Sequence, residues 1–198
     1  MTIWLGALIF GVWIYILYVL SRSDVPALRF IWGSAGVFVL LMILVQPVLT
    51  EPLAKVVASI AGGFGKLTGM FSAYFKYGVL FVDSDAGSIS LLIDFECSGI
   101  LEIMAFVSLL AFYKVYTRYE RVMIGVLGVI YIILANALRI IVICSVIYVF
   151  GMPAYYIAHT FVGRIVFYGL SILLYFFVFT KAQIIRQKVG GFSYGLDK

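Results

Sequence analysis

Five long apolar stretches set the strongest constraint on how this chain can fold. A helix needs about 20 predominantly apolar residues to cross the hydrocarbon core of a bilayer. A water-soluble fold of 198 residues could not bury so much apolar surface, because 65% of the residues are hydrophobic and only 12% are charged. The sequence therefore predicts one integral membrane domain over residues 1–198, with spans at about 3–20, 30–49, 98–116, 122–150 and 159–180.

The distribution of Lys and Arg residues predicts the orientation of these spans. Basic residues gather in the connections 21–29 and 114–121 and in the tail from residue 181, and cytoplasmic segments carry such an excess. The loop 50–97 instead holds five acidic residues. We therefore expect a multi-pass plasma membrane protein with its N-terminus outside and its C-terminus inside. The net charge of +5 then comes from cytoplasmic loops that anchor the protein in the membrane, and we do not expect nucleic acid as a partner.

The outer loop 50–97 has a secondary-structure pattern of its own. Apolar residues between positions 53 and 71 repeat at helical spacing, which indicates an interfacial or re-entrant helix. Residues 79–82 and 89–96 flank the polar segment 83–88, and the second of these arms alternates apolar and polar residues. This pattern predicts a short β-hairpin lying over the outer membrane surface. The expected fold class is thus an all-α polytopic membrane protein with an extracellular helix and hairpin.

Three ionisable residues lie inside predicted spans, where charge is costly and indicates function or pairing. They are Glu102, Arg139 and Arg164. Because an unpaired buried carboxylate is unfavourable, we expect Glu102 to pair with one of the two arginines. Asn136 precedes Arg139 by three residues and shares its helix face. Arg164 follows His159 by five residues, which in a regular α-helix puts the two on different faces.

Cys97 and His159 form a candidate nucleophile and base at the outer face. Cys97 precedes the predicted third span, where the positive end of a helix dipole stabilises a thiolate, although the neighbouring Glu96 opposes this. His159 is the only histidine, and imidazole exchanges protons near neutral pH. Three other interpretations stay open. In the first, Cys97 is a small residue that packs in the core. In the second, His159 is an interfacial residue with a satisfied hydrogen bond. In the third, Cys97 forms a disulfide with Cys144.

Metal and cofactor motifs are absent from the sequence. It contains no HExxH motif, no Gly-rich phosphate loop and no CxxC motif. We therefore expect neither a metal ion nor another cofactor.

Three short motifs resemble those of the exosortase/archaeosortase family, which are polytopic membrane proteins of bacteria and archaea. The family's proposed catalytic Cys, Arg and His match Cys97, Arg139 and His159, and we take Ser98, Glu102, Asn136 and Arg164 as supporting residues. With five spans the chain is close to the family's minimal core, and it looks most like the compact Gram-positive branch called exosortase G. The motifs occur in the family's order: Glu96-Cys97-Ser98-Gly99-Ile100, Asn136-Ala137-Leu138-Arg139-Ile140, and His159 followed by Gly163.

The resemblance implies a membrane-embedded cysteine protease or transpeptidase that acts in protein sorting at the bacterial cell surface. Such an enzyme cleaves a C-terminal sorting signal, made of a short motif, a transmembrane helix and a basic tail, and passes the protein to an acceptor. Cys97 would attack the carbonyl, His159 would carry the proton and Arg139 would stabilise the oxyanion. The implied partners are a membrane-anchored substrate protein or a lipid-linked acceptor and, in exosortase G, glycosyltransferases.

Two further functions stay open at this point. One is a membrane transferase that acts on a lipid-linked glycan or a lipid in surface polymer assembly. The other is a non-enzymatic export or assembly subunit, in which Glu102, Arg139 and Arg164 only hold the helices together. A transporter is disfavoured, because the sequence shows no internal repeat and its polar residues gather at one face.

Overall fold

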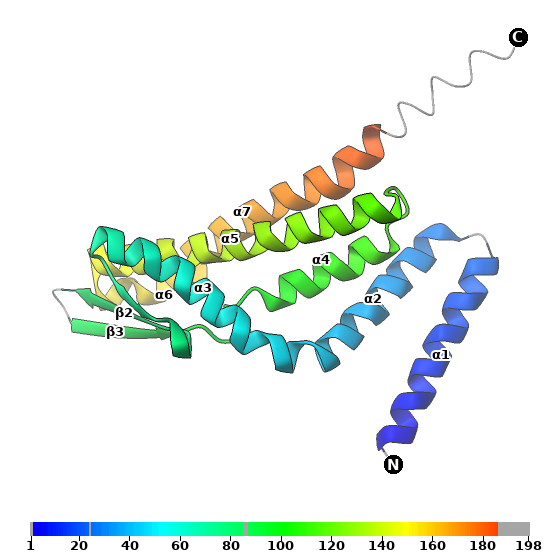
Figure 1. Cartoon of the computed structure of the whole chain (residues 1–198), viewed down its shortest axis with the longest axis horizontal. Helices are drawn as coiled ribbons and strands as arrows, with labels where there is room; N and C mark the ends of the chain where they lie inside the picture. Colours follow the sequence, from blue (N-terminus) through cyan, green and yellow to red (C-terminus); the bar gives the residue numbers. More distant parts are fainter. Residues whose placement is uncertain (1, 24, 85–86, 186–198) are drawn as a thin grey trace, which may run out of the picture.

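The computed structural model describes residues 2–23, 25–84 and 87–185. Figure 1 shows a row of helices with a small sheet at one end. Residues 85–86 of the predicted hairpin connection 83–88 and most of the predicted basic tail lie outside the described residues. The helices are α1 (Thr2–Arg22), α2 (Pro26–Leu44), α3 (Gln46–Thr68), α4 (Ile100–Phe112), α5 (Arg118–Phe150), α6 (Tyr155–Ile157) and α7 (Gly163–Tyr175).

Three helical stretches among the described residues are long and apolar enough to cross a membrane. They are Pro26–Leu44, Arg118–Phe150 and Met152–Ile185. The third is one continuous path in which α6 and α7 are joined by a π-helical turn, Ala158–Val162. Two shorter apolar helices, Leu8–Arg22 and Ile100–Phe112, correspond to the other two predicted spans. The architecture is thus that of a mostly helical, polytopic membrane protein, and the number of spans stays a prediction.

Glycine and proline explain where the observed helices depart from the predicted spans. The α2 helix ends at Leu44 rather than near 49, because Pro47 lies in the first turn of α3, where a missing N–H costs nothing. The α4 helix has only 13 residues because it begins after Gly99 and gives way to extended backbone at Tyr113. The α3 helix confirms the predicted helix of the outer loop and ends at Gly69, whose φ of 72° is typical of a glycine cap.

The outer loop also contains a three-stranded antiparallel sheet in the order β1-β2-β3. Strands β2 (Val79–Ser84) and β3 (Gly87–Leu92) confirm the predicted hairpin, with Leu80 opposite Leu91. Strand β1 (Ser72–Tyr74) was not predicted, because three residues are too short for an alternation pattern. The sheet has one buried face, on which Leu80, Val82 and Ile89 lie. Strand β3 ends at Leu92, short of the predicted 96, because a tight turn follows it.

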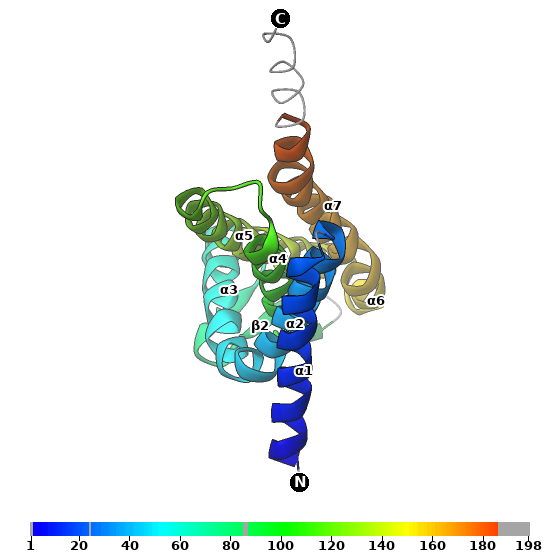
Figure 2. The same ribbon diagram turned by 90° about the vertical axis from the view of Figure 1, so that its right-hand side faces the viewer.

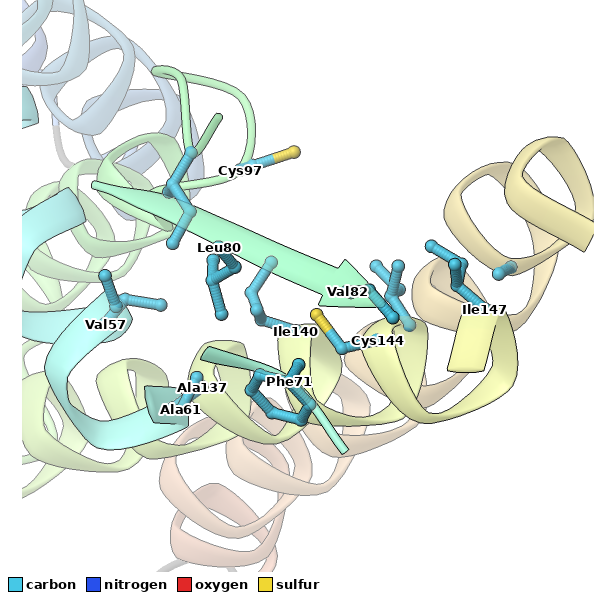
Figure 3. Packing of buried hydrophobic residues seen from close by; sticks show 14 of the residues in the cluster. Val57, Ala61, Phe71, Leu80, Val82, Cys97, Ala137, Ile140, Cys144 and Ile147 are labelled. Atoms are coloured by element: carbon cyan, nitrogen blue, oxygen red, sulfur yellow. The ribbon is translucent and has the colours of Figure 1, made fainter. Parts of the chain in front are cut away.

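The buried face of the sheet packs on α3 and α5 (Figure 3). Small residues of α3 allow this close approach. A Cβ on Gly62, for instance, would lie 2.4 Å from the Cβ of Ala73 in β1. Cys144 of α5 is buried in this core beside Val82 and Ile140 and is a free thiol, as is Cys97. The open alternative of a Cys97–Cys144 disulfide is therefore wrong for this structure.

The two ends of the molecule are built from different segments of the chain. The α1–α2 connection, the α4–α5 connection and the end of α7 lie together at one end, and the sheet lies at the other (Figures 1 and 2). Arg29, Lys114 and Arg121 line one cavity at the first end. The helix arrangement thus places the basic connections and the sheet of the loop 50–97 at opposite ends of the molecule, and the orientation of these ends in the membrane stays a prediction.

Candidate active site

A tight turn between β3 and α4 presents Cys97. The backbone N–H of Cys97 donates to the Asp94 carboxylate at 3.0 Å and to the Asp94 carbonyl at 3.2 Å. Gly99 then adopts a φ of 81°, a left-handed conformation that a residue with a side chain rarely takes, and α4 begins at the next residue. This turn fixes the sulfur at the N-terminal end of α4.

Ser98 supports the turn rather than the sulfur. Its hydroxyl donates to the Phe95 carbonyl at 3.0 Å and accepts from the N–H of Ile100 at 3.3 Å, and the residue is fully buried. Both contacts are to backbone atoms. We therefore assign Ser98 a structural role in holding the Cys97 turn.

His159 reaches Cys97 from the π-helical turn Ala158–Val162. Its Nε2 lies 3.3 Å from Cys97 Sγ, within hydrogen-bond distance for sulfur. The ring of Tyr155, one turn earlier, stacks on the imidazole with 5.9 Å between ring centroids and an interplanar angle of 17°. Gly163 lets this helix approach α5, since a Cβ there would lie 2.6 Å from Ile143. The side chains of Cys97 and His159, which the sequence predicts to meet, are thus in direct contact.

Arg139 approaches the same sulfur from α5. Its Nη2 donates to Cys97 Sγ at 3.8 Å, and the residue is 94% buried, with a relative exposure of 6%. The guanidinium carbon lies 5.6 Å from the centroid of the Phe167 ring, an aromatic face that suits a buried cation. A fixed positive charge therefore stands beside the sulfur.

Asn136 fixes the backbone of the cysteine itself. Its Nδ2 donates to the Cys97 carbonyl at 2.6 Å, and the residue is fully buried. Asn136 and Arg139 are three residues apart on α5, and both contact Cys97, as their predicted common helix face requires. One face of α5 thus holds the carbonyl and the sulfur of the same residue.

The electrostatics of the turn favour a protonated thiol. Burial raises the pKa of the Cys97 thiol to about 11; Arg139 lowers it, and the carboxylates of Asp94 and Glu96 raise it. The α4 dipole is expected to stabilise the thiolate and so to lower the pKa of Cys97. The pKa is raised instead, because burial removes the charged form from water and this is the largest effect on it. A nucleophilic thiolate here needs a proton acceptor, and His159 Nε2 is the one in contact.

The predicted ion pair of Glu102 with an arginine is wrong for the described residues. The only salt bridge among them joins Lys55 and Glu51 at 2.7 Å. Glu102 Oε2 is buried and has no hydrogen-bond partner, although Arg139 attracts its charge from beyond contact distance. The physical reason is that the Arg139 guanidinium points to the sulfur of Cys97 and not to the carboxylate one and a half turns further along α4.

Arg164 makes no hydrogen bond or salt bridge to another described residue, but it acts electrostatically on His159. The prediction that these two residues occupy different faces assumed a regular α-helix. The observed π turn, with its i→i+5 hydrogen bonding, changes that angular relationship. Arg164 therefore lies near the site and affects the charge of His159, but it makes no hydrogen bond to the described site residues.

Two contact residues were not predicted. Asp94 carries a recognisable signal, since Asp side chains accept from backbone N–H groups a few residues on and so stabilise turns. Tyr155 also had one, because residues four apart on a helix are neighbours. A cavity of about 20 Å³ adjoins the sulfur, and residues from the sheet and α5, including Leu80, Leu91 and Ile143, line it. No group of three or more metal-ligating side chains occurs in the part of the chain that the structure describes.

The comparison with known families gives a match over most of the chain. The family described as transmembrane exosortase (Exosortase_EpsH) matches residues 2–177. The chain belongs to the exosortase family. Exosortases are a class of membrane cysteine transpeptidases. The match is to the exosortase family as a whole, so the resemblance to the exosortase G branch stays a prediction. No curated protein and no solved structure gives a match to this exosortase.

Proposed function

We propose that this exosortase is a sorting transpeptidase that works through an acyl-enzyme on Cys97. The observation that carries the proposal is that side chains of two helical segments meet at one sulfur atom: His159 Nε2 lies 3.3 Å away and Arg139 Nη2 3.8 Å away. A base, a permanent charge and a thiol are the groups that acyl transfer requires.

The first half of the reaction forms a thioester. His159 Nε2 takes the thiol proton as Cys97 Sγ attacks the scissile carbonyl, and the negative charge on the carbonyl oxygen develops near the Arg139 guanidinium. The carbon–nitrogen bond then breaks, and His159 returns the proton to the leaving amine. The product is an acyl group on Cys97 and a released C-terminal segment.

The second half transfers the acyl group to an acceptor. An acceptor nucleophile gives its proton to His159 and attacks the thioester, and the Cys97 thiolate leaves and is reprotonated. A single hydrogen-bond donor at an oxyanion contributes roughly 100- to 1000-fold in rate. Arg139, buried and stacked near Phe167, is preorganised for that role.

The substrate we propose is a membrane-anchored protein with a C-terminal sorting signal, cleaved at the outer face of the plasma membrane. Support for the outer face comes from the opposite end of the molecule, where Arg29, Lys114 and Arg121 gather as cytoplasmic segments do. Reporter fusions at residues 25 and 118 should be cytoplasmic, and a fusion at residue 85 should be external. A cytoplasmic reporter at 85 would contradict the proposed side of the reaction.

The decisive experiment is to look for the acyl group. Wild-type enzyme isolated from cells that hold its substrates should carry a hydroxylamine-labile adduct on Cys97, and mass spectrometry should identify it as a peptide acyl group. The Cys97→Ala variant should lack the adduct, and uncleaved precursors should accumulate, while Cys144→Ala should behave as wild type. A wild-type enzyme without adduct, in cells whose surface polymer depends on Cys97, would favour the lipid-linked glycan transferase instead.

A further inference from the structure

A large cavity lies at the end of the molecule remote from Cys97. It has a volume of about 750 Å³ and is bounded by the start of α2, the end of α4, the α4–α5 connection and residue 183 after α7. We call it the basic pocket, because Arg29, Lys114 and Arg121 line it together with the aromatic residues Phe30 and Tyr113. None of the described lining residues is a carboxylate.

The cations of the basic pocket are not neutralised by the described residues. Arg121 donates to the backbone carbonyls of Ala111, Tyr113 and Tyr116 at 3.1–3.3 Å, which fixes its charge in the wall without cancelling it. Neither Arg29 nor Lys114 forms an ion pair or hydrogen bond within the described part of the chain. Three positive charges of this kind attract an anion.

An apolar groove begins where the basic pocket ends. It has a volume of about 480 Å³ and runs between α4 and α5, and it shares Ala111 and Arg121 with the pocket. Its other lining residues are all apolar: Val107, Leu110, Val122, Gly125, Val126, Val129 and Ile130. Gly125 helps to open it, since a Cβ there would meet only Leu110, at 3.5 Å.

The two spaces together point to one kind of ligand. We propose that an anionic phospholipid binds here, with its phosphate between Arg29, Lys114 and Arg121 and an acyl chain in the groove between α4 and α5. A free phosphate would use the cations but leave the groove unexplained. A lipid without net charge would fill the groove but leave the excess positive charge of the pocket unbalanced. Basic pockets between helices at a membrane surface recognise phospholipid headgroups by this combination. The inference is independent of the reaction at Cys97.

The test measures lipid affinity by native mass spectrometry on the purified full chain in a neutral detergent. The probes are phosphatidylglycerol, phosphatidylcholine with the same acyl chains, and glycerol phosphate. Phosphatidylglycerol should bind at least fivefold more tightly than phosphatidylcholine. Glycerol phosphate at high excess should not displace it, since it lacks the chains.

Variants assign the binding to the pocket and the groove. Arg29→Ala and Lys114→Ala should each weaken phosphatidylglycerol binding about fivefold, as the loss of one cation near a lipid phosphate predicts, and should leave phosphatidylcholine unchanged. Gly125→Leu should weaken both lipids, and the milder Gly125→Ala replaces it if the larger variant does not fold. Lys66→Ala removes a charge from α3 and is the matched control without effect.

Three results would overturn the inference. Equal affinity for the two lipids would show that the charges do not select a headgroup with a net negative charge. Displacement by glycerol phosphate would show a site for free anions. Binding that is unchanged in both Arg29→Ala and Lys114→Ala would place the lipid elsewhere on the protein.

Discussion

The sulfur of Cys97 lies 3.3 Å from Nε2 of His159, although 62 residues separate them in the chain. The contact joins the turn before α4 to the π turn before α7, and Arg139 of α5 stands on the third side. Each of the three residues thus comes from a different part of the chain: a turn, a π turn and a long α-helix. The predictions below test what this arrangement does.

Replacement of the nucleophile should abolish transfer without unfolding the protein. Cys97→Ala removes the attacking atom, and Cys97→Ser should be nearly as inactive, because a hydroxyl is a weaker nucleophile than a thiol beside an imidazole. Cleavage of a membrane-anchored substrate in cells measures the loss. Cys144→Ala is the control: its sulfur lies in the core away from the site, so activity should persist. An active Cys97→Ala enzyme would exclude the acyl-enzyme.

The pH dependence should reveal the buried thiol. In a His159→Ala, Cys144→Ala protein, alkylation of Cys97 should accelerate about tenfold per pH unit, because only the thiolate reacts, and should level off near the raised pKa of about 11. With His159 present, transfer should fall as the pH drops below neutral and the imidazole becomes protonated. An alkylation profile that levels off near pH 7 in the His159→Ala background would contradict the raised pKa.

Arg139 should not be replaceable by lysine. Arg139→Lys keeps a positive charge but loses the Nη2 atom that reaches the sulfur, so the transfer rate should fall about 100-fold, as for loss of one oxyanion donor. Single-turnover rates on purified enzyme measure this. Arg164→Lys is the matched control on α7, where no contact is lost, and should keep most of its activity. An Arg139→Lys enzyme that keeps wild-type activity would mean that charge alone matters.

Alanine substitutions at Gly99 and Gly69 distinguish the effect of backbone strain from the effect of damage to the site. Gly99 and Gly69 have φ values of 81° and 72°, so alanine at either position should cost roughly 1–2 kcal/mol of unfolding free energy. A Cβ at Gly99 would also meet Asn136 Nδ2 at 3.3 Å, whereas nothing lies within 4 Å of one at Gly69. Gly99→Ala should therefore also lower activity, and Gly69→Ala should not. Denaturant unfolding and transfer rates compare the two.

Glu102 should tolerate removal of its charge. Because its buried Oε2 has no partner, Glu102→Gln breaks no hydrogen bond of that atom and should not destabilise the protein. Loss of one partner of a buried ion pair would instead cost roughly 3–5 kcal/mol. Thermal unfolding in detergent distinguishes the two outcomes. A large loss of stability would show that the carboxylate pairs with an arginine after all.

Local patterns in the sequence were sufficient for the elements that depend on neighbouring residues. Alternation in residues 89–96 and the polar segment 83–88 predicted the β2–β3 hairpin, and apolar periodicity predicted α3. Strand faces repeat every two residues, and helix faces repeat every three to four. Helix ends were less accurate. Pro47 belongs to α3 rather than α2, and α4 has 13 residues where a full span was expected, since turns set by Gly99 and Tyr113 override apolar length.

The sequence by itself determined that the chain is a helical membrane protein, and its three motifs singled out Cys97, Arg139 and His159. Only the tertiary structure decided how these side chains meet. The π turn that places His159, the absence of an ion pair at Glu102 and the cavity between the basic connections all depend on contacts between distant segments. Composition and periodicity describe which face of a helix is apolar, but the distance between two side chains depends on how the helices pack against one another.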